Sequence, residues 1–361
     1  MIIWIGRMLI GMVMILHGQG QDDIGYFQSS TITLPGNTDL VERVIYDSLL
    51  DQQIYQVSTS HGIPMHYYMQ LNTGVCFDNQ CRPLSILVYW NITGRYLGFK
   101  LEDGEFLSKY DHEPFSVDEY KKLHQLLADP FLPLGEYTFE ELVRDTTTME
   151  SPVDGVSGAT SEDVLDYIVP GAAYTTYKLW NVVYGPIQQQ VIQQTEKQLD
   201  AELFNKILES TDQSDITWAL ERVALIKELD EQTINLIADI IVEGEYFLAY
   251  LALRSLSQEQ LDMDHLQKQL IRSLSKADQG VIDLILERLM HANTLGNRTI
   301  DESFSQIKSL NNTQLLSLLE LYAHHQISDQ RLCPILEESM ASQNAFVKNQ
   351  VLKYYDKLSC K

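Results

Sequence analysis

One short stretch of the sequence combines a tight turn, a hydroxyl and the start of an apolar helical pattern. Asp154-Gly155 and Ser157-Gly158 supply the turn, and the helical pattern begins at Val164. Thr160 is a suitable N-cap, with Asp163 in the capping-box position three residues later. An oxygen at a helix start lies among unpaired N–H groups and the positive end of the helix dipole, where a phosphate ester is stabilised. From the residues alone, an ordinary capped helix after a glycine turn is the favoured interpretation.

A second group of chemically capable residues is the run Lys109-Tyr-Asp-His-Glu113. It brings a base, two acids and His112 together, as a catalytic or metal site does, although such a cluster is also typical of a solvated turn. His324-His325 and the run Asp262–His265 lie in helical surroundings without a third ligand at suitable spacing. The sequence contains no G-x-S-x-G elbow, HExxH, P-loop or GxGxxG. A hydrolase or other enzyme built on the His112 region is therefore the weakest of the hypotheses.

The run Asp154-x-x-Ser157-Gly158-Ala159-Thr160-Ser161 resembles the flavinylation motif of FMN-binding domains. Such domains occur in the flavin-carrying subunits of the sodium-translocating NADH:quinone oxidoreductase and of the related Rnf complex. The resemblance implies that a flavin transferase links FMN through its phosphate to Thr160, outside the cytoplasm. It also implies a recognition segment made of Asp154, Ser157, Gly158, Ala159 and Ser161.

Aromatic residues that follow this motif could flank the isoalloxazine ring, although aromatics at helical spacing are usually core residues. They are Tyr167, Tyr174, Tyr177 and Trp180. Since a bound flavin does the chemistry, the resemblance implies an electron carrier more than a stand-alone enzyme.

Residues 1–20 have the layout of a secretory signal peptide. Arg7 precedes an apolar run over residues 8–16, and the small residues Gly18 and Gly20 follow it. The alternative is a membrane anchor, but the run is shorter than the roughly 20 residues that span a bilayer. We therefore expect cleavage near Gly20 and a periplasmic or secreted protein that does not span the membrane once processed.

The four cysteines are even in number, which in an oxidising compartment favours disulfides. We expect the pairs Cys76–Cys81 and Cys333–Cys360, one in each half of the chain. A metal site or covalent haem is less favoured, because the sequence has no CxxC, no nearby histidine with ligand spacing and no CxxCH.

The charge balance limits the possible partners. The chain has 361 residues, with 50 Asp or Glu against 26 Lys or Arg, and so a net charge of −24. Neither half is basic, so nucleic acid and anionic membrane surfaces would be repelled. At about 100 to 200 residues per domain, the length predicts two domains.

Residues 21–186 mix helix and strand signals, and nine of the ten prolines lie at or before Pro186. The apolar spacing predicts a helix over 40–55, and a capping box formed by Ser116 and Glu119 predicts another over 116–127. Strands are predicted over 85–91 and 95–101, followed by a hairpin turn at Asp103-Gly104 into a strand over 105–109. The pattern therefore predicts an α+β domain with an antiparallel sheet.

Residues 187–361 are expected to be purely helical and repetitive. Five apolar blocks recur at offsets of 30, 34, 33 and 32 residues, with second helices between them at 232–242 and 263–274. The blocks are DITWALERVALI, EYFLAYLALRSL, QGVIDLILERLM, NTQLLSLLELYA and NAFVKNQVLKYY. A two-helix unit at this period is typical of an α-solenoid and resembles HEAT repeats. An irregular helical bundle is the alternative.

Two functional hypotheses follow. In the first, the protein is an extracytoplasmic electron carrier with FMN on Thr160 that docks onto a redox partner through the helical repeats. In the second, it is a secreted or periplasmic HEAT-like scaffold without a cofactor, and Thr160 is only a helix cap.

Overall fold

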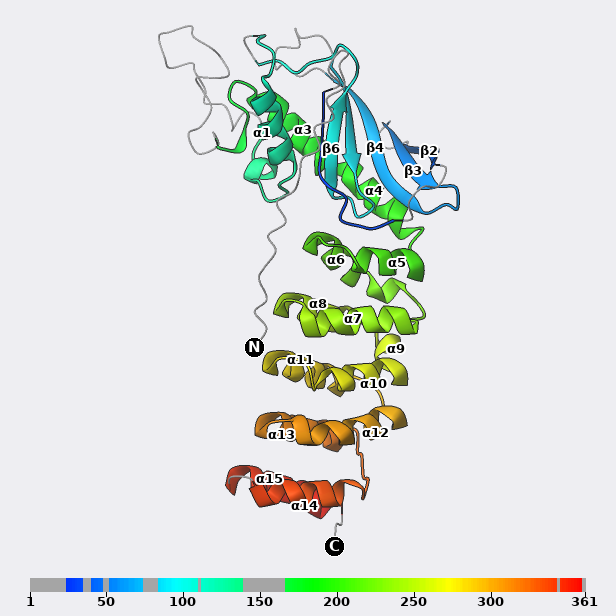
Figure 1. The fold of residues 1–361 in the computed structure, drawn as a ribbon, viewed down its shortest axis with the longest axis vertical. Coiled ribbons are helices and arrows are strands. Elements are labelled where there is room, and N and C mark those ends of the chain that lie inside the picture. The colour runs from blue at the N-terminus through cyan, green and yellow to red at the C-terminus, as the bar shows by residue number, and fades with distance from the viewer. Residues whose placement is uncertain are drawn as a thin grey trace, which may run out of the picture. The chain divides into compact units, whose positions relative to one another are not determined.

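The computed structural model describes residues 24–34, 40–47, 52–73, 84–109, 112–138, 166–342 and 345–358. These residues belong to two compact units, one that ends at Gln198 and one that begins at Leu199 (Figure 1). The first unit contains a sheet and helices and the second is helical, which confirms the predicted order of an α+β part followed by an all-α part.

A six-stranded antiparallel sheet forms the frame of the first unit, in the order β1-β6-β5-β4-β3-β2. The predicted strands at 85–91 and 95–101 are confirmed as β5 and β6. They are joined by a turn in which Gly94 has a φ of +84°. The strands are β1 (Gly25–Phe27), β2 (Leu40–Asp47), β3 (Gln52–Thr59), β4 (Pro64–Thr73), β5 (Leu84–Trp90) and β6 (Tyr96–Leu101).

The helix predicted over 40–55 is wrong, because the described residues of this segment form strands. Strand β2 pairs with β3 from Leu40 opposite Thr59 to Asp47 opposite Gln52. Val41 and Val44 are about half exposed, at 52% and 51%, so they do not form the buried stripe that the helical spacing suggested. Valine and isoleucine favour strands, and the pairing with β3 decides between the two structures.

The strand predicted over 105–109 is also wrong. The turn before it is present, with Gly104 at a φ of +81° and the Glu105 N–H donating to the Glu102 carbonyl at 2.9 Å. Beyond the turn, the described residues make only an isolated bridge between Ser108 and Pro114. The edge of β6 that a returning strand would need is already paired with β1.

Helices α1 (Val117–Leu127), α3 (Ala173–Val183) and α4 (Pro186–Glu196) complete the first unit, together with the 3₁₀ helix η1 (Pro133–Glu136). The predicted capping box of α1 is confirmed. The Glu119 N–H donates to Ser116 Oγ at 3.3 Å, and the Ser116 N–H donates to Glu119 Oε2 at 2.7 Å. This reciprocal pair satisfies two N–H groups that the helix itself leaves without acceptors.

The three helices pack against one face of the sheet, which we call the helix face. Trp90 of β5 donates its indole N–H to the Val183 carbonyl at the end of α3, at 2.9 Å. Tyr67 of β4 is hydrogen-bonded to Thr195 of α4 at 3.0 Å. The Gln56 and Gln198 side chains exchange amide hydrogen bonds of 2.8 and 3.1 Å. Since Gln56 and Tyr67 are buried, α4 and the residues just after it complete the core of this unit.

The second unit consists of helices at the positions where the apolar blocks predict them. The five blocks correspond to α6, α8, α11, α13 and α15, and the predicted second helices at 232–242 and 263–274 correspond to α7 and α10. The helices are α5 (Ala201–Leu208), α6 (Gln213–Leu220), α7 (Glu231–Glu243), α8 (Tyr246–Ser255), α9 (Gln258–Leu261), α10 (Asp264–Ser273), α11 (Gln279–Met290), α12 (Asn297–Gln306), α13 (Asn312–His324), α14 (Leu332–Ser342) and α15 (Ala345–Lys357). Two 3₁₀ helices, η4 (Val223–Leu225) and η5 (Ile307–Ser309), lie between them.

Contacts between these helices follow two rows (Figure 1). One row runs α5, α7, α10 and α12, and the other runs α6, α8, α11, α13 and α15. Buried glutamines link successive pairs through backbone carbonyls. Gln260 donates to the carbonyls of Val223 and Ile226 at 2.8 and 2.7 Å, and Gln267 donates to those of Leu261 and Thr294. Within the described part of the chain, no helix combines the length and the apolar character needed to cross a membrane.

Candidate functional site

The residues predicted to bind a cofactor lie outside the described residues. This holds for Thr160 and for Asp154, Ser157, Gly158, Ala159 and Ser161. Three of the four cysteines, Cys76, Cys81 and Cys360, also lie outside them, whereas Cys333 lies in α14. The FMN attachment and the two disulfide pairings therefore stay predictions.

Helix α3 holds the chain on both sides of residues 139–165, which contain the predicted attachment site. On the side before them, the Tyr177 hydroxyl donates to the Tyr137 carbonyl at 3.1 Å. On the side after them, the Val169 N–H donates to the Thr176 hydroxyl oxygen at 3.2 Å, and Val169 is buried. The same helix is thus hydrogen-bonded to the chain just before and just after this segment.

Two of the aromatic residues considered as flavin neighbours have packing roles. Trp180 is 7% exposed, and its indole N–H donates to the Asp129 carbonyl at 3.0 Å. Gly135 lies directly against the Trp180 ring, because a Cβ at this glycine would be 3.1 Å from the ring. Together with the Tyr177 bond described above, these contacts fix the segment after α1 onto α3.

Ion pairs involve the two described ends of the run Lys109–Glu113. The Lys109 ammonium lies 3.0 Å from the Glu113 carboxylate and 3.4 Å from that of Glu119. His112 is exposed, and its backbone has a φ of +65° with its N–H donating to the Lys109 carbonyl. This arrangement favours the solvated-turn interpretation, since His112 is exposed and the Lys109 ammonium is paired with two carboxylates.

The other histidine and carboxylate candidates are hydrogen-bonded to groups of the protein itself. Asp262 accepts from the Asn293 N–H and side-chain amide at 2.7 and 2.6 Å. His265 and His325 lie 3.2 and 3.0 Å from the Leu229 and Leu289 carbonyls. Over the residues that the structure describes, no three His, Cys, Asp or Glu side chains are grouped as a metal site requires.

The structure also shows an aromatic row that the sequence analysis did not identify. It consists of Tyr55, Tyr68, Tyr89 and Phe27, which follow one another across β3, β4, β5 and β1 on the face of the sheet opposite the helix face. The Tyr55 and Tyr68 rings are stacked with centroids 4.8 Å apart, and the Tyr68 and Tyr89 centroids are 5.4 Å apart. Phe27 meets Tyr89 edge-on at 5.1 Å. Alternating aromatics in several strands are the sequence signal for such a row.

The Tyr68 and Tyr89 phenols of this row stay protonated at neutral pH, because the pKa of each is raised. Partial burial raises the pKa of Tyr68, and a hydrogen bond to the Glu42 carboxylate raises it further. Burial also raises the pKa of Tyr89. Neutral phenols can donate hydrogen bonds and offer ring faces, but they are poor bases and nucleophiles in this state.

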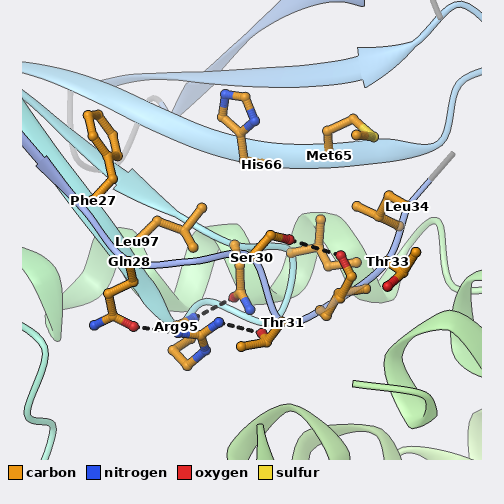
Figure 2. A pocket seen from close by; sticks show the side chains of 13 residues that line it. Phe27, Gln28, Ser30, Thr31, Thr33, Leu34, Met65, His66, Arg95 and Leu97 are labelled. Carbon is orange, nitrogen blue, oxygen red and sulfur yellow. Dashed lines mark hydrogen bonds between the residues drawn. The ribbon is translucent and has the colours of Figure 1, made fainter. Parts of the chain in front are cut away.

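A cavity of about 490 Å³ lies at one end of the aromatic row (Figure 2). Residues of the 27–34 segment form one side, and Met65 and His66 of β4 form another. Asn91, Ile92 and Arg95 of the β5–β6 turn close it, together with Leu97 of β6. The sheet topology brings these three stretches together, because β1 pairs with β6 and β4 pairs with β5.

The Arg95 side chain links two walls of this cavity. Its guanidinium donates to Gln28 Oε1 at 2.6 Å and to Thr31 Oγ1 at 2.5 Å, as Figure 2 shows. The Arg95 N–H itself donates to the Asn91 side-chain oxygen at 2.8 Å, which fixes the turn that carries it. Burial lowers the pKa of His66 on the facing strand, so this imidazole is neutral at pH 7.

These features describe a cavity with a fixed cation, a neutral imidazole and an aromatic rim. A search with this chain against known protein families, curated proteins and solved structures gives no match.

Proposed function

We propose that the protein is an extracytoplasmic electron-transfer flavoprotein that carries FMN esterified to Thr160. The observation that carries this proposal is the run from Asp154 to Ser161, with its resemblance to the flavinylation motif. The signal-peptide layout of residues 1–20 supports it independently, because flavinylation of this kind takes place outside the cytoplasm. A periplasmic or secreted location follows from the same argument.

The donor chemistry of the attachment segment fits a phosphoester. Thr160 supplies the hydroxyl, and Gly158 has no side chain that would obstruct an anion. The N-terminus of a helix that starts after Thr160 would stabilise the negative charge of the phosphate. When bound, FMN supplies reversible electron transfer, and the protein supplies attachment and position.

The anchoring of both segment ends on α3 further supports a tether. Because Tyr137 and Val169 are fixed by hydrogen bonds to the same helix, the segment between them is attached to the folded unit at two points. A covalent ester in such a segment would keep the cofactor with the protein in a compartment where free FMN is scarce.

We further propose that the helical unit is a HEAT-like α-solenoid that binds the redox partner. The repeat offsets of 30 to 34 residues and the two rows of helix contacts support this arrangement. The excess of acidic residues favours a partner with a basic surface, since complementary charge steers association.

A scaffold without a cofactor is the second candidate function. One observation favours it, namely three exposed aromatic side chains on α8. Tyr246, Phe247 and Tyr250 are 57%, 53% and 37% exposed. Neighbouring exposed aromatics are typical of protein-binding surfaces.

Intact mass measurement separates the two candidates. The full chain is co-expressed with a flavin transferase, and we expect an added mass equal to FMN minus water. The adduct should be lost in Thr160→Ala and kept in Thr147→Ala, a matched threonine outside the motif. An unmodified wild-type protein, or an adduct that survives in Thr160→Ala, contradicts the proposed attachment.

A further inference from the structure

Three exposed aromatic side chains lie close together at the start of α8, and we call them the α8 patch. Tyr246, Phe247 and Tyr250 each have more than a third of their surface in solvent. Tyr250 is three residues from Phe247 and four from Tyr246, so the three positions are neighbours on one side of the helix. A contiguous group of exposed rings is typical of a surface that binds another protein.

The neighbouring helix α11 supports this patch without covering it. The Tyr246 ring lies over Gly280, where a Cβ would be 3.3 Å from the ring. Figure 1 shows α8 and α11 in successive layers of the helical unit. Because Gly280 has no side chain, the ring rests on α11 and still leaves 57% of its surface in solvent. The exposed part of this ring is therefore held in place and is open to a partner.

The charged residues around the α8 patch are mainly acidic. Over residues 243–254 and 276–284, the exposed charged side chains are four carboxylates and two cations, namely Glu243, Glu245, Asp278, Asp283, Arg254 and Lys276. None of these four carboxylates forms an ion pair with another described residue. Glu245 directly precedes Tyr246, and Asp278 lies two residues before Gly280. This charge favours a basic partner, since complementary charge steers association.

The rings of the patch can also accept a cation directly. The Arg254 guanidinium lies 5.7 Å from the centroid of the Tyr250 ring and donates a hydrogen bond to the Tyr250 hydroxyl. Such a cation–π contact is favourable at an exposed ring. Among the described residues, no cation occupies the faces of Tyr246 and Phe247. These two faces are therefore open to a cation from another molecule.

We propose that the α8 patch binds an extended basic segment of a partner protein, with an arginine or lysine stacked on Tyr246 or Phe247 and an apolar side chain beside it. The patch covers about 6 Å along the helix, which matches about two residues of extended chain. A globular partner would need about 800 Å² on this surface. The proposal rests on the proposed role of the helical unit in partner binding, and it names the surface and the chemistry of that contact.

Fluorescence anisotropy with the full chain, made without a flavin transferase, tests the chemistry. The probe is a fluorescein-labelled peptide of three Arg-Pro-Leu repeats. One control peptide has glutamate in place of every arginine, and the other has serine in place of every leucine. We expect a Kd below about 100 μM for the probe and binding at least about tenfold weaker for each control. Equal binding of either control peptide, or no binding of the probe at about 1 mM protein, would overturn the proposal.

Two double variants locate the binding. Tyr246→Ser with Phe247→Ser keeps the charge of the chain and should weaken binding of the probe at least about tenfold. Phe131→Ser is the matched control, since it removes an exposed ring from the first unit and should leave binding unchanged.

Glu245→Gln with Asp278→Asn should weaken binding about threefold or more. Glu320→Gln with Asp356→Asn is its control, because it removes the same charge from α13 and α15. Undiminished binding in the Tyr246, Phe247 double variant would overturn the α8 patch as the site. It would not bear on the attachment at Thr160, which intact mass measures separately.

Discussion

Aromatic rings reach the surface in both units, but those on the sheet lie against one another, whereas those on α8 are exposed to solvent. Tyr55, Tyr68 and Tyr89 form a continuous series of ring contacts across three strands. On α8, Tyr246 and Phe247 are more than half exposed. Tyr246 lies over Gly280 of α11, where a Cβ would be 3.3 Å from the ring.

This difference in exposure indicates that aromatic residues stabilise the fold in the sheet unit and are exposed for binding in the helical unit. Contacts between rings on neighbouring strands bury apolar surface and so stabilise this face of the sheet. Exposed rings on a helix add little to folding and are available for contacts with other proteins. Loss of a ring should therefore destabilise the sheet unit and leave the helical unit folded.

The largest effect is expected at a glycine whose Cβ position is already occupied by a neighbouring ring and by backbone atoms. A Cβ at Gly98 of β6 would be 2.2 Å from the Tyr26 carbonyl oxygen and 2.6 Å from the Phe27 ring, so β1 must move in Gly98→Ala. We expect a loss of about 2 to 3 kcal/mol, measured by amide hydrogen exchange in β5 and β6.

Gly280→Ala is the matched control in the helical unit. Its new methyl group meets only the exposed Tyr246 ring, which can shift. The stability of α11 should stay the same or rise slightly, because alanine is the better helix former. If Gly280→Ala lost as much stability as Gly98→Ala, the two units would not differ in how tightly their rings are packed.

Removal of the central ring of the aromatic row gives the next effect. Tyr68→Ala breaks the contacts with Tyr55 and Tyr89 and should cost about 2 kcal/mol in denaturant unfolding of the sheet unit. Tyr68→Phe keeps the ring and loses only the hydrogen bond to Glu42, so it should cost about 0.5 kcal/mol. Equal losses in the two variants would mean that the hydroxyl matters more than the stacking.

Acidification should weaken the sheet unit through His124. Burial lowers the pKa of this histidine to about 4, below its ordinary value of 6.5, and its Nδ1 lies 3.1 Å from the Tyr96 hydroxyl. As the pH falls, His124 is therefore protonated in the unfolded chain before it is protonated in the folded one. The stability that the neutral histidine contributes is present above pH 6.5 and is lost as the pH falls toward 4. Since the ring is partly exposed, we expect a loss of about 1 to 2 kcal/mol.

Urea unfolding at pH 7 and at pH 4.5, within the window of His124, measures this effect. His124→Gln should reduce the pH dependence, and His291→Gln, at an exposed histidine of the helical unit, should leave it unchanged. An undiminished pH dependence in His124→Gln would assign the effect to another group.

The smallest effect is expected on α8. The double variant Tyr246→Ser, Phe247→Ser should change the free energy of unfolding by no more than about 0.5 kcal/mol, because both rings are largely in solvent. Amide hydrogen exchange in α8 and α11 measures the stability of this unit. A loss of several kcal/mol would show that these rings stabilise the helices.

Local signals account for what the sequence predicts correctly. The Ser116–Glu119 capping box and the apolar runs of the second unit act within one or two turns, so the helices there follow from spacing alone. Val41, Val44 and Ile45 fit a helical stripe as well as a strand, and the cross-strand partners in β3 that decide between them are not visible in the pattern.

The cavity could not be predicted for a related reason. Its walls come from three stretches of the chain that meet only because β1 pairs with β6 at the edge of the sheet. In the sequence, Arg95 next to Gly94 looks like an ordinary turn residue, because its hydrogen bonds to Gln28 and Thr31 form only in the folded sheet. Motif reading found the Thr160 segment instead, because that signal lies within eight consecutive residues.

The position of α4 has a practical consequence for dividing the protein into fragments. An N-terminal fragment cut just before Pro186 would lose Thr195 and Gln198. The buried Tyr67 hydroxyl would then lack its partner on α4, and the buried Gln56 amide would lack its partner just after α4. A cut after Gln198 keeps both pairs. The longer fragment should express as a folded sheet unit, and the shorter one should aggregate, even though the proline marks the more conspicuous break in the sequence.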